Sequence, residues 1–297
     1  MRLSVIIPVL RRDAFFVECR ASVGDDPDVE VIAIEGVSPV GRARNEALSR
    51  ATGDWILFVD ADDLLAPGWL TVVRGMIARH PQVDMVGFGR SEKLPLEPCV
   101  LGDDREIDVS ETLPDDIVDR YLWQYAYRRD LLRELHFTEF VRGEDRLFEG
   151  EALLRARRVA VCEAVLYGYR QHAASAMHAL WSRQNVSDEI AWRVAWVRKL
   201  TDSGKTMSRR AWREMGLYLL EYIPYDGRQV VDPSERRAVR ECWFAALAEV
   251  DKRFFSAWQR GVMRLLSVTR SRVLAWVLCR MPFELKRRTM FLRRHRT

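Results

Sequence analysis

The chain has few cysteines and no long apolar run. No C-x-x-C pair occurs, so the sequence predicts neither a zinc site nor a disulfide framework, and reduced thiols of a cytosolic protein are the expectation. No stretch approaches the roughly 20 apolar residues that span a bilayer, and the N-terminal apolar run is too short for a secretory signal. We therefore expect a cytoplasmic protein that is soluble or lies on a membrane surface. The five cysteines are Cys19, Cys99, Cys162, Cys242 and Cys279.

Charge is unevenly spread along the chain. Residues 251–297 contain 13 basic and 2 acidic residues, although the net charge of the whole chain is only +4. From about residue 260 to 297, arginines alternate with Leu, Val, Trp and Phe, which predicts basic amphipathic helices suited to an anionic membrane surface. A helical subdomain with a solvated basic face is the alternative. No helix-turn-helix, RNA-recognition or zinc module accompanies the basic segment, so we expect no nucleic-acid partner.

Apolar segments alternate with helix-compatible segments in the first part of the chain. Strands that are apolar throughout are typical of a parallel sheet covered on both faces, and their alternation with helices predicts an α/β fold with a mostly parallel, Rossmann-like sheet. The expected strands are residues 3–9, 29–34, 55–60 and 83–89, and the expected helices are 14–23, 41–51 and 67–77.

The rest of the chain is less regular. Residues 94–119 are polar and contain three prolines, which indicates loops, and residues 117–135 combine strong helix formers with bulky aromatics. Residues 143–160 begin with acids and end with arginines, the polarity that a helix dipole favours. Beyond residue 177 the composition is helical. We expect a catalytic domain over residues 1–178 and a helical region over 179–297.

Three acids, Asp60, Asp62 and Asp63, directly follow the apolar segment 55–59. In open α/β sheets, ligands bind at the carboxyl ends of the strands. Two carboxylates in a D-x-D turn can bind a hard divalent cation, and such an ion can stabilise a diphosphate leaving group. The alternative is that the acids cap a helix beginning near Pro67 or occupy a solvated turn. Asp63 is expected to be structural.

Several stretches together resemble the family 2 glycosyltransferases, which have a GT-A fold. These are "LSVIIPV" (3–9), "GRARNEALSRATGDWILFVDADD" (41–63) and "GEDRLF" (143–148), and the resemblance spans about residues 3–178. Residues 123–139 and 166–178 also resemble bacterial members that build surface polysaccharides. The resemblance implies a nucleotide-sugar donor, usually UDP-linked, with Mn²⁺ or Mg²⁺ bound at the D-x-D motif.

Carried over by position, the resemblance makes Asp62 the direct metal ligand, and Asp60 a contact to the ribose or the hydrated ion. It places Arg44 near the nucleotide, although a surface helix arginine is the alternative. Pro8 and Glu35 fall on the donor side of the site.

The chain departs from the family pattern beside Glu35. Where the family has two acids, as in "DDGS", this chain has "IEGVS", with Gly36 in place of the second acid. "PVL" also replaces the usual "PVY" after the first strand. Which nucleobase the donor site recognises is therefore left open by the sequence.

Inverting sugar transfer needs a base that takes the proton from the acceptor hydroxyl, and a carboxylate suits this role. The resemblance assigns it to Asp145, with Glu144 as its neighbour at the acceptor. Acids that open a helix are also favoured by the helix dipole alone.

Downstream of a probable strand, His172 or His178 could complete the metal site, since neutral imidazole binds Mn²⁺. Arg170 could face the diphosphate or pair with an acid. Trp123 and Tyr125 could stack on an acceptor sugar, although aromatics at this spacing are more often core residues.

These features predict a metal-dependent, inverting glycosyltransferase that acts on a hydroxyl of a glycan or lipid-linked glycan, peripheral on the inner face of the cell membrane. Two alternatives stay open. One is a nucleotidyltransferase, which can use a related sheet and metal-binding acids. The other is an inactive membrane-associated scaffold of a polysaccharide assembly complex, which the altered "IEGVS" segment keeps open.

Overall fold

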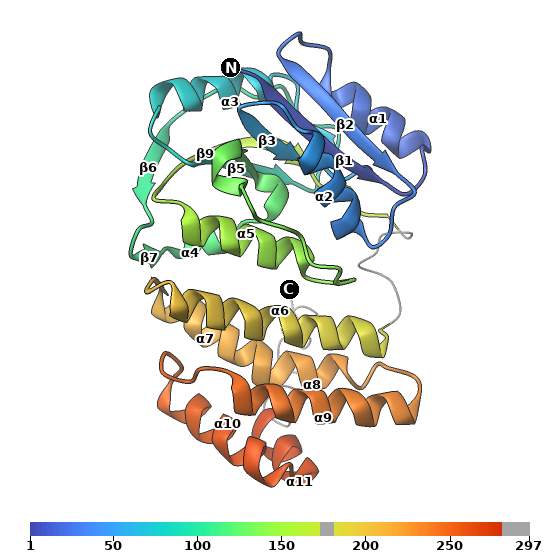
Figure 1. Ribbon diagram of the computed structural model, residues 1–297, viewed down its shortest axis with the longest axis vertical. Helices are drawn as coiled ribbons and strands as arrows, with labels where there is room; N and C mark the ends of the chain where they lie inside the picture. Colours follow the sequence, from blue (N-terminus) through green and yellow to red (C-terminus); the bar gives the residue numbers. More distant parts are fainter. Residues whose placement is uncertain (173–180, 281–297) are drawn as a thin grey trace, which may run out of the picture. The chain divides into compact units, whose positions relative to one another are not determined.

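The computed structural model describes residues 1–172 and 181–280 (Figure 1). The chain divides into two compact units. Unit 1 comprises residues 1–178 together with 203–206, and unit 2 comprises residues 179–202 and 207–297.

Unit 1 is built on a mixed eight-stranded sheet. Strand β1 (Leu3–Val9) pairs in parallel with both β2 (Val29–Glu35) and β3 (Trp55–Phe58), and β5 (Met85–Ser91) pairs in parallel with β9 (Arg158–Gly168). Strand β8 (Tyr125–Arg128) lies antiparallel between β3 and β5 and joins these two parallel parts. The α/β architecture predicted from the sequence is confirmed. The strand order is β2, β1, β3, β8, β5, β9 and β4 (Leu64–Leu65), with β6 (Asp104–Asp108) paired to β9.

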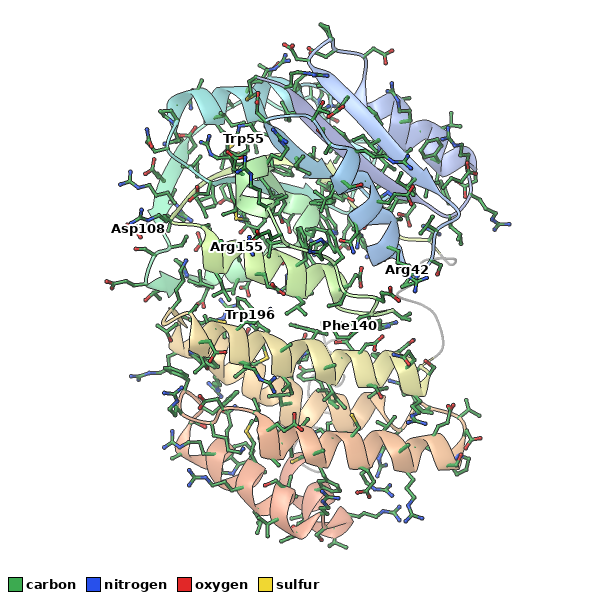
Figure 2. All side chains as sticks on the ribbon, viewed as in Figure 1. Arg42, Trp55, Asp108, Phe140, Arg155 and Trp196 are labelled. Atoms are coloured by element: carbon green, nitrogen blue, oxygen red, sulfur yellow. The ribbon has the colours of Figure 1, made fainter. Side chains whose placement is uncertain are left out.

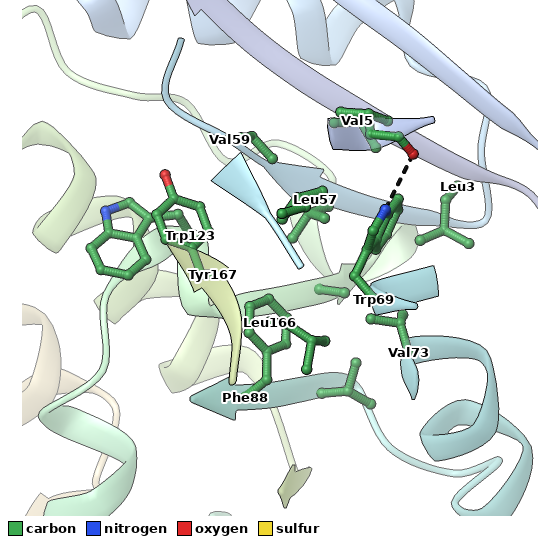
Figure 3. Packing of buried hydrophobic residues seen from close by; sticks show 14 of the residues in the cluster. Leu3, Val5, Leu57, Val59, Trp69, Val73, Phe88, Trp123, Leu166 and Tyr167 are labelled. Carbon is green, nitrogen blue, oxygen red and sulfur yellow. Dashed lines mark hydrogen bonds between the residues drawn. The ribbon is translucent and has the colours of Figure 1, made fainter. Parts of the chain in front are cut away.

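The central strands are apolar because they are buried. Every residue of β1 and β3 is buried, as expected for strands covered on both faces. Figure 3 shows part of this packing, in which Leu57 and Val59 belong to the same buried cluster as Tyr167 and Leu166. Helices α1 (Ala14–Val23) and α3 (Trp69–Arg79) are tied together, since Trp69 Nε1 donates to the carbonyl of Val23 at 3.2 Å. Helix α2 (Val40–Arg50) contacts β1 and β2.

The segment 117–135 is not one helix, despite its helix formers. It contains the end of α4 (Asp115–Val118), the short 3₁₀ helices η1 (Leu122–Gln124) and η2 (Arg129–Leu132), and the central strand β8. Tyr125 and Tyr127 are fully buried, and their hydroxyls donate to the carbonyls of Ile117 and Leu122 at 2.8 and 2.9 Å. Pairing on both edges and aromatic packing override helix propensity here.

Helix α3 begins two residues later than expected. Its N-cap is Gly68, which has φ +89° and makes no side-chain capping bond. A Cβ at this position would also lie 2.7 Å from the carbonyl oxygen of Cys99, so both backbone and space favour glycine. Strand β4 separates this cap from Asp63. The acidic cluster therefore does not cap α3.

Helix α5 (Glu144–Arg155) carries acids in its first turn. At its other end, Lys205 Nζ donates to the carbonyls of Leu153 and Ala156 at 3.1 and 2.6 Å. A cation at a helix C-terminus binds carbonyls that lack partners within the helix. Thr206 N–H donates to the carbonyl of Glu111 at 2.9 Å, beside the short strand pair β7 (Thr112–Leu113) and β10 (Thr206–Met207).

Unit 2 is helical, as its composition predicts. Trp196, Trp212 and Trp243 are buried in it, and Trp243 Nε1 donates to the carbonyl of Leu219 at 2.6 Å (Figure 2 labels Trp196). Among the described helices, none combines the length and apolar composition that crossing a membrane requires. Its elements are α6 (Arg183–Asp202), α7 (Arg209–Leu217), η4 (Tyr218–Tyr222), α8 (Ile223–Asp226), α9 (Pro233–Glu249), α10 (Ala257–Thr269), α11 (Arg272–Ala275) and η5 (Trp276–Arg280).

Candidate active site at the end of strand β3

The acidic cluster forms a turn directly after β3. Val59, the residue that follows the strand, is fully buried, and Asp63 N–H donates to the carbonyl of Asp60 at 3.0 Å. The turn brings Asp60, Asp62 and Asp63 to the carboxyl end of the strand, where an α/β sheet binds its ligands. The three carboxylates nevertheless have different surroundings.

Asp63 is the buried member of the cluster, with 1% of its surface exposed. Its carboxylate accepts hydrogen bonds from Tyr167 Oη at 2.6 Å and from the backbone N–H of Arg170 at 2.7 Å. Burial raises the pKa of Asp63 to about 8, and the charge of Asp60 adds to the shift. Asp60 N–H donates to Tyr167 Oη at 3.2 Å. Asp63 and Tyr167 therefore join the turn to the end of β9.

Asp60 is linked to helix α5 through a buried arginine. Arg44 donates to Asp60 Oδ1 at 2.8 Å and to Glu144 Oε1 at 2.6 Å. Burial alone would lower the pKa of Arg44, but the charges of Asp60 and Glu144 outweigh it and raise the pKa. Burial raises the pKa of Glu144 to about 7, and raises that of Asp60 against the opposing charge of Arg44. The predicted alternative of a surface arginine at position 44 is therefore wrong.

Asp62 is the accessible member, with 38% of its side chain exposed, and it meets His172. The distance from His172 Nε2 to Asp62 Oδ2 is 2.8 Å. Two residues of helix α1, Phe15 and Glu18, contact the segment that contains Arg170 and His172. Arg170 donates to Glu18 Oε2 at 2.6 Å and to the carbonyl of Asp62 at 2.9 Å, and its guanidinium lies 4.6 Å from the Phe15 ring centroid. The Phe15 ring also lies 4.9 Å from that of His172.

Asp145 is the second residue of α5 and is half-buried. Within residues 1–172 and 181–280, its carboxylate has no hydrogen-bond or ion-pair partner, although its charge acts on Arg44, Asp60 and Glu144. Glu144, in contrast, is buried and paired. Of the two acids that open this helix, Asp145 is the one whose carboxylate is available to a ligand.

The donor-side candidates lie at the ends of β1 and β2. Glu35 is exposed and accepts from Arg12 Nε at 3.0 Å. Gly36, at the position where the resemblance implies a second acid, has φ +73° and donates its N–H to the carbonyl of Val9. Pro8 is buried within β1, where it pairs with Ile34. Glu35 is therefore accessible at this edge, whereas Pro8 belongs to the strand core.

Trp123 lies in an aromatic stack and is only 5% exposed. Its ring is stacked on Tyr167 at 4.2 Å and on Tyr121 at 5.1 Å between centroids, and the Arg90 guanidinium lies 5.8 Å from it. The packing of Trp123 and the full burial of Tyr125 match the core alternative. Tyr121 is the exposed aromatic ring of this stack.

Helix α2 positions the loop before α5. Asn45 Nδ2 donates to the carbonyl of Phe137 at 2.9 Å, and Phe137 N–H donates to Asn45 Oδ1 at 2.8 Å. A Cβ at Gly41 would lie 2.3 Å from the carbonyl oxygen of Thr138, so no larger residue fits there. Arg44 also lies 5.4 Å from the Phe137 ring centroid.

Several contributing residues were not predicted from the sequence. Tyr167, Arg12, Glu18 and Phe15 all contact predicted site residues. The tyrosines of "LYGYR" were the available signal for Tyr167, since a buried tyrosine hydroxyl usually has a polar partner. His178, the other histidine considered as a metal ligand, lies outside the described residues.

The residues at the turn fit a divalent cation by their donor chemistry. Carboxylate oxygen and neutral imidazole nitrogen are both ligands of Mn²⁺, and Asp62 and His172 bring one of each together. Across the part of the chain that the structure describes, no three His, Cys, Asp or Glu side chains are grouped so that they could hold a metal ion, so this part of the chain offers at most two ligands here. Such a partial set leaves coordination positions for a substrate.

Comparison with known proteins finds a family model that matches part of the chain. Residues 14–135 match the model described as Glycosyl transferase family 2. The Uncharacterized glycosyltransferase EpsJ of Bacillus subtilis (strain 168) is 27% identical over 214 residues, which are 58% of this chain and 62% of the relative. The Putative glycosyltransferase EpsH of the same organism is 26% identical over 154 residues, 46% of this chain and 43% of the relative. The matches thus span less than two thirds of either relative.

Solved structures share the fold. The crystal structure of S. aureus TarS 1–349 in complex with UDP-GlcNAc matches with a TM-score of 0.68 and 18% identity, covering 93% of this chain and 90% of that chain. The complex of the same protein with UDP matches with a TM-score of 0.65 and 18% identity over the same shares of both chains. The predicted GT-A fold, followed by a helical region, is thereby confirmed. The chain is thus similar to glycosyltransferase family 2 over residues 14–135, and it has the GT-A fold.

Proposed function

We propose that the chain transfers a sugar, with inversion, from a nucleotide-sugar donor to a hydroxyl of a glycan or lipid-linked glycan. The observation that carries the proposal is the pairing of accessible Asp62 with His172 beside Asp60, while Arg44 connects Asp60 to the helix that begins with Glu144 and Asp145. A donor site and a candidate base are thereby joined through one buried cation.

Asp145 acts as the base in this proposal. Its carboxylate is half-buried and has no partner in the described chain, so it is available to accept the proton of an acceptor hydroxyl. The first turn of α5 holds it rigidly, and Glu144 remains bound to Arg44. Arg44 is a positioning residue, because its guanidinium is buried and bound to two carboxylates.

Asp62 and His172 would hold a divalent ion, Mn²⁺ or Mg²⁺, with Asp60 beside it. When bound, such an ion offsets the charge of a diphosphate and stabilises the departing nucleotide. Arg170 positions Asp62 in this proposal, since it donates hydrogen bonds to the carbonyl of Asp62 and to the carboxylate of Glu18.

For the donor, we propose a UDP-linked sugar, bound at the edge where Glu35 and Arg12 lie. The support is the fold shared with TarS, whose structures contain UDP-GlcNAc and UDP. We further propose a surface-polysaccharide acceptor and a peripheral position on the inner face of the cell membrane, reached through the basic segment from about 260 to 297. The excess of basic residues in 251–297 supports this contact.

A donor panel tests the proposal. UDP-, GDP- and dTDP-sugars are added with and without Mn²⁺, and the thermal midpoint of unfolding is measured together with release of free nucleotide. We expect a UDP-sugar to raise the midpoint only with Mn²⁺, because a ligand that binds the native state stabilises it by mass action.

The same panel separates the two alternatives. Stabilisation by a nucleoside triphosphate, with release of pyrophosphate, would indicate a nucleotidyltransferase. The absence of stabilisation by any donor would indicate a scaffold and would contradict the proposed function.

A further inference from the structure

Helix α10 exposes a row of large apolar side chains. Trp258, Leu265 and Val268 are 49%, 42% and 83% exposed. Their spacing of seven and three residues places them on one face of the helix. The other face is mostly apolar and packs into unit 2 through buried residues. We call the exposed residues the apolar row; the buried residues of α10 are Gln259, Val262, Met263 and Leu266.

A basic hollow lies beside the apolar row. It has a volume of about 800 Å³ and is lined by residues 250–253, from the loop before α10, and by Arg260, Arg264, Ser267 and Val268. Its lining holds four cations and one acid, Asp251. Val268 belongs to both features, so the hollow and the apolar row form one continuous surface. The four cations are Lys252, Arg253, Arg260 and Arg264.

The four cations differ in how many hydrogen bonds they already make within the protein. Arg253 is bound to Asp251 by both carboxylate oxygens, and Arg260 donates to the carbonyl of Phe255. Lys252 Nζ donates to two carbonyls, those of Ala248 and Val250, which leaves one of its three protons.

Arg264 is the exposed cation of the hollow that has no bound acceptor. Its guanidinium has no hydrogen-bond or ion-pair partner within residues 1–172 and 181–280. Burial and the charge of Arg264 both lower the pKa of Lys252. A bound anion would relieve this repulsion, so the hollow has the electrostatics of an anion site.

The basic hollow and the apolar row together indicate which kind of anionic partner fits this surface. A free phosphate or a nucleic acid would use the cations and leave the apolar row in water. A bilayer surface offers phosphate groups and an apolar phase side by side, and tryptophan is enriched at that boundary. Exposed valine and leucine beside arginine are typical of helices that lie in such an interface.

We propose that α10 and the loop before it form a binding surface for an anionic phospholipid bilayer, with headgroup phosphates at Arg264 and Lys252 and the apolar row at the edge of the acyl region. This assigns to described residues the membrane contact included in the proposed function, on which it rests.

Vesicle co-sedimentation of the full chain, without nucleotide, tests the assignment. Vesicles of phosphatidylcholine alone are compared with vesicles that also contain phosphatidylglycerol, at low and high salt. We expect binding to the anionic vesicles only, weakened by salt. Arg264→Glu should reduce the partition coefficient at least about fivefold, the effect of removing one cation near an anionic surface. Trp258→Ser should reduce it as well.

Arg2→Glu is the matched control, since it makes the same charge change at an exposed residue of unit 1. It should leave vesicle binding close to that of the unchanged chain. All variants should keep the thermal midpoint, because the replaced side chains are exposed, and should keep stabilisation by donor and Mn²⁺. Retained donor binding with lost vesicle binding thus separates this inference from the proposed function.

Three outcomes would overturn the proposal. Full binding by the Arg264→Glu, Trp258→Ser double variant would assign the membrane contact to another part of the chain. Equal binding to vesicles without phosphatidylglycerol would remove the role of the cations. Stabilisation by inorganic phosphate that is lost in Arg264→Glu, without vesicle binding, would make the hollow a site for free phosphate.

Discussion

Asp60, Asp62 and Asp63 stand almost side by side in the sequence, yet each carboxylate has different partners. Asp63 is buried against Tyr167, Asp60 is paired with Arg44, and Asp62 is accessible beside His172. Three acids crowded at a strand end repel one another unless cations or donors separate them. Tyr167 and Arg44 offset the repulsion at Asp63 and Asp60, whereas Asp62 remains accessible to a ligand.

The first prediction concerns Arg44. Arg44→Ala would leave Asp60 and Glu144 without their shared cation in a buried position, and breaking a buried ion pair in this way costs about 3–5 kcal/mol. We expect a clear loss in the free energy of unfolding, measured with urea. Arg42→Ala, on the same helix, removes an exposed pair with Glu139 and should change little. Equal effects of the two substitutions would contradict the structural role of Arg44.

The second prediction separates the base from the metal site. Asp145→Asn should lower the transfer rate by roughly 10²–10⁴-fold, the usual contribution of a general base, while donor binding with Mn²⁺ stays intact. The measurement is the single-turnover rate with donor saturating, together with the donor-induced shift in the thermal midpoint. A rate within about threefold of the unchanged chain would remove Asp145 from its assigned role.

At the scale of elements, local sequence patterns predicted the first half of the sheet well. The strands at 3–9 and 29–34 and the helix at 14–23 are observed, because their apolar periodicity is set by which face they bury. Strand β8 was not predicted, since its residues lie among helix formers and become a strand only by pairing with β3 and β5. Pairing partners distant in sequence leave no local signal.

The site divides in the same way. The acids after β3 could be recognised from their position, whereas the contacts of Asp62 with His172 and of Arg44 with Glu144 join residues about a hundred positions apart. Their geometry depends on how β9 and α5 pack on the sheet. The sequence therefore indicated which residues to consider, and the fold decided which of them meet.

The third prediction concerns the buried face of α5. Burial raises the pKa of Glu149 to about 8 from an ordinary 4.5, although Arg146 opposes the shift from 3.0 Å. The pKa of Glu149 is higher in the folded state than in the unfolded state. Its contribution to the free energy of unfolding is therefore complete below about pH 4.5 and is lost as pH rises through about 8. Urea midpoints of the unchanged chain should therefore fall relative to Glu149→Gln across this range. A constant difference between the two would contradict the raised pKa.

At the scale of the whole molecule, the two units carry different chemistry. Unit 1 contains the β3 turn with its acids, and unit 2 contains the basic hollow and the apolar row of α10. The basic end of the sequence falls in unit 2. We therefore propose that unit 1 binds the donor and performs the transfer, whereas unit 2 binds an anionic membrane that contains a lipid-linked acceptor.

Asp62 is the residue on which the proposed metal-dependent use of a nucleotide sugar depends most. The most direct test compares the unchanged chain with Asp62→Asn and with Asp25→Asn, a control that removes a carboxylate that is 93% exposed. The thermal midpoint is measured with a UDP-sugar, with and without Mn²⁺. At a donor concentration about 100 times Kd, binding stabilises the native state by about 2.7 kcal/mol. We expect a Mn²⁺-dependent rise in the unchanged chain and in Asp25→Asn, and none in Asp62→Asn; an undiminished rise in Asp62→Asn would contradict the proposed role of this carboxylate.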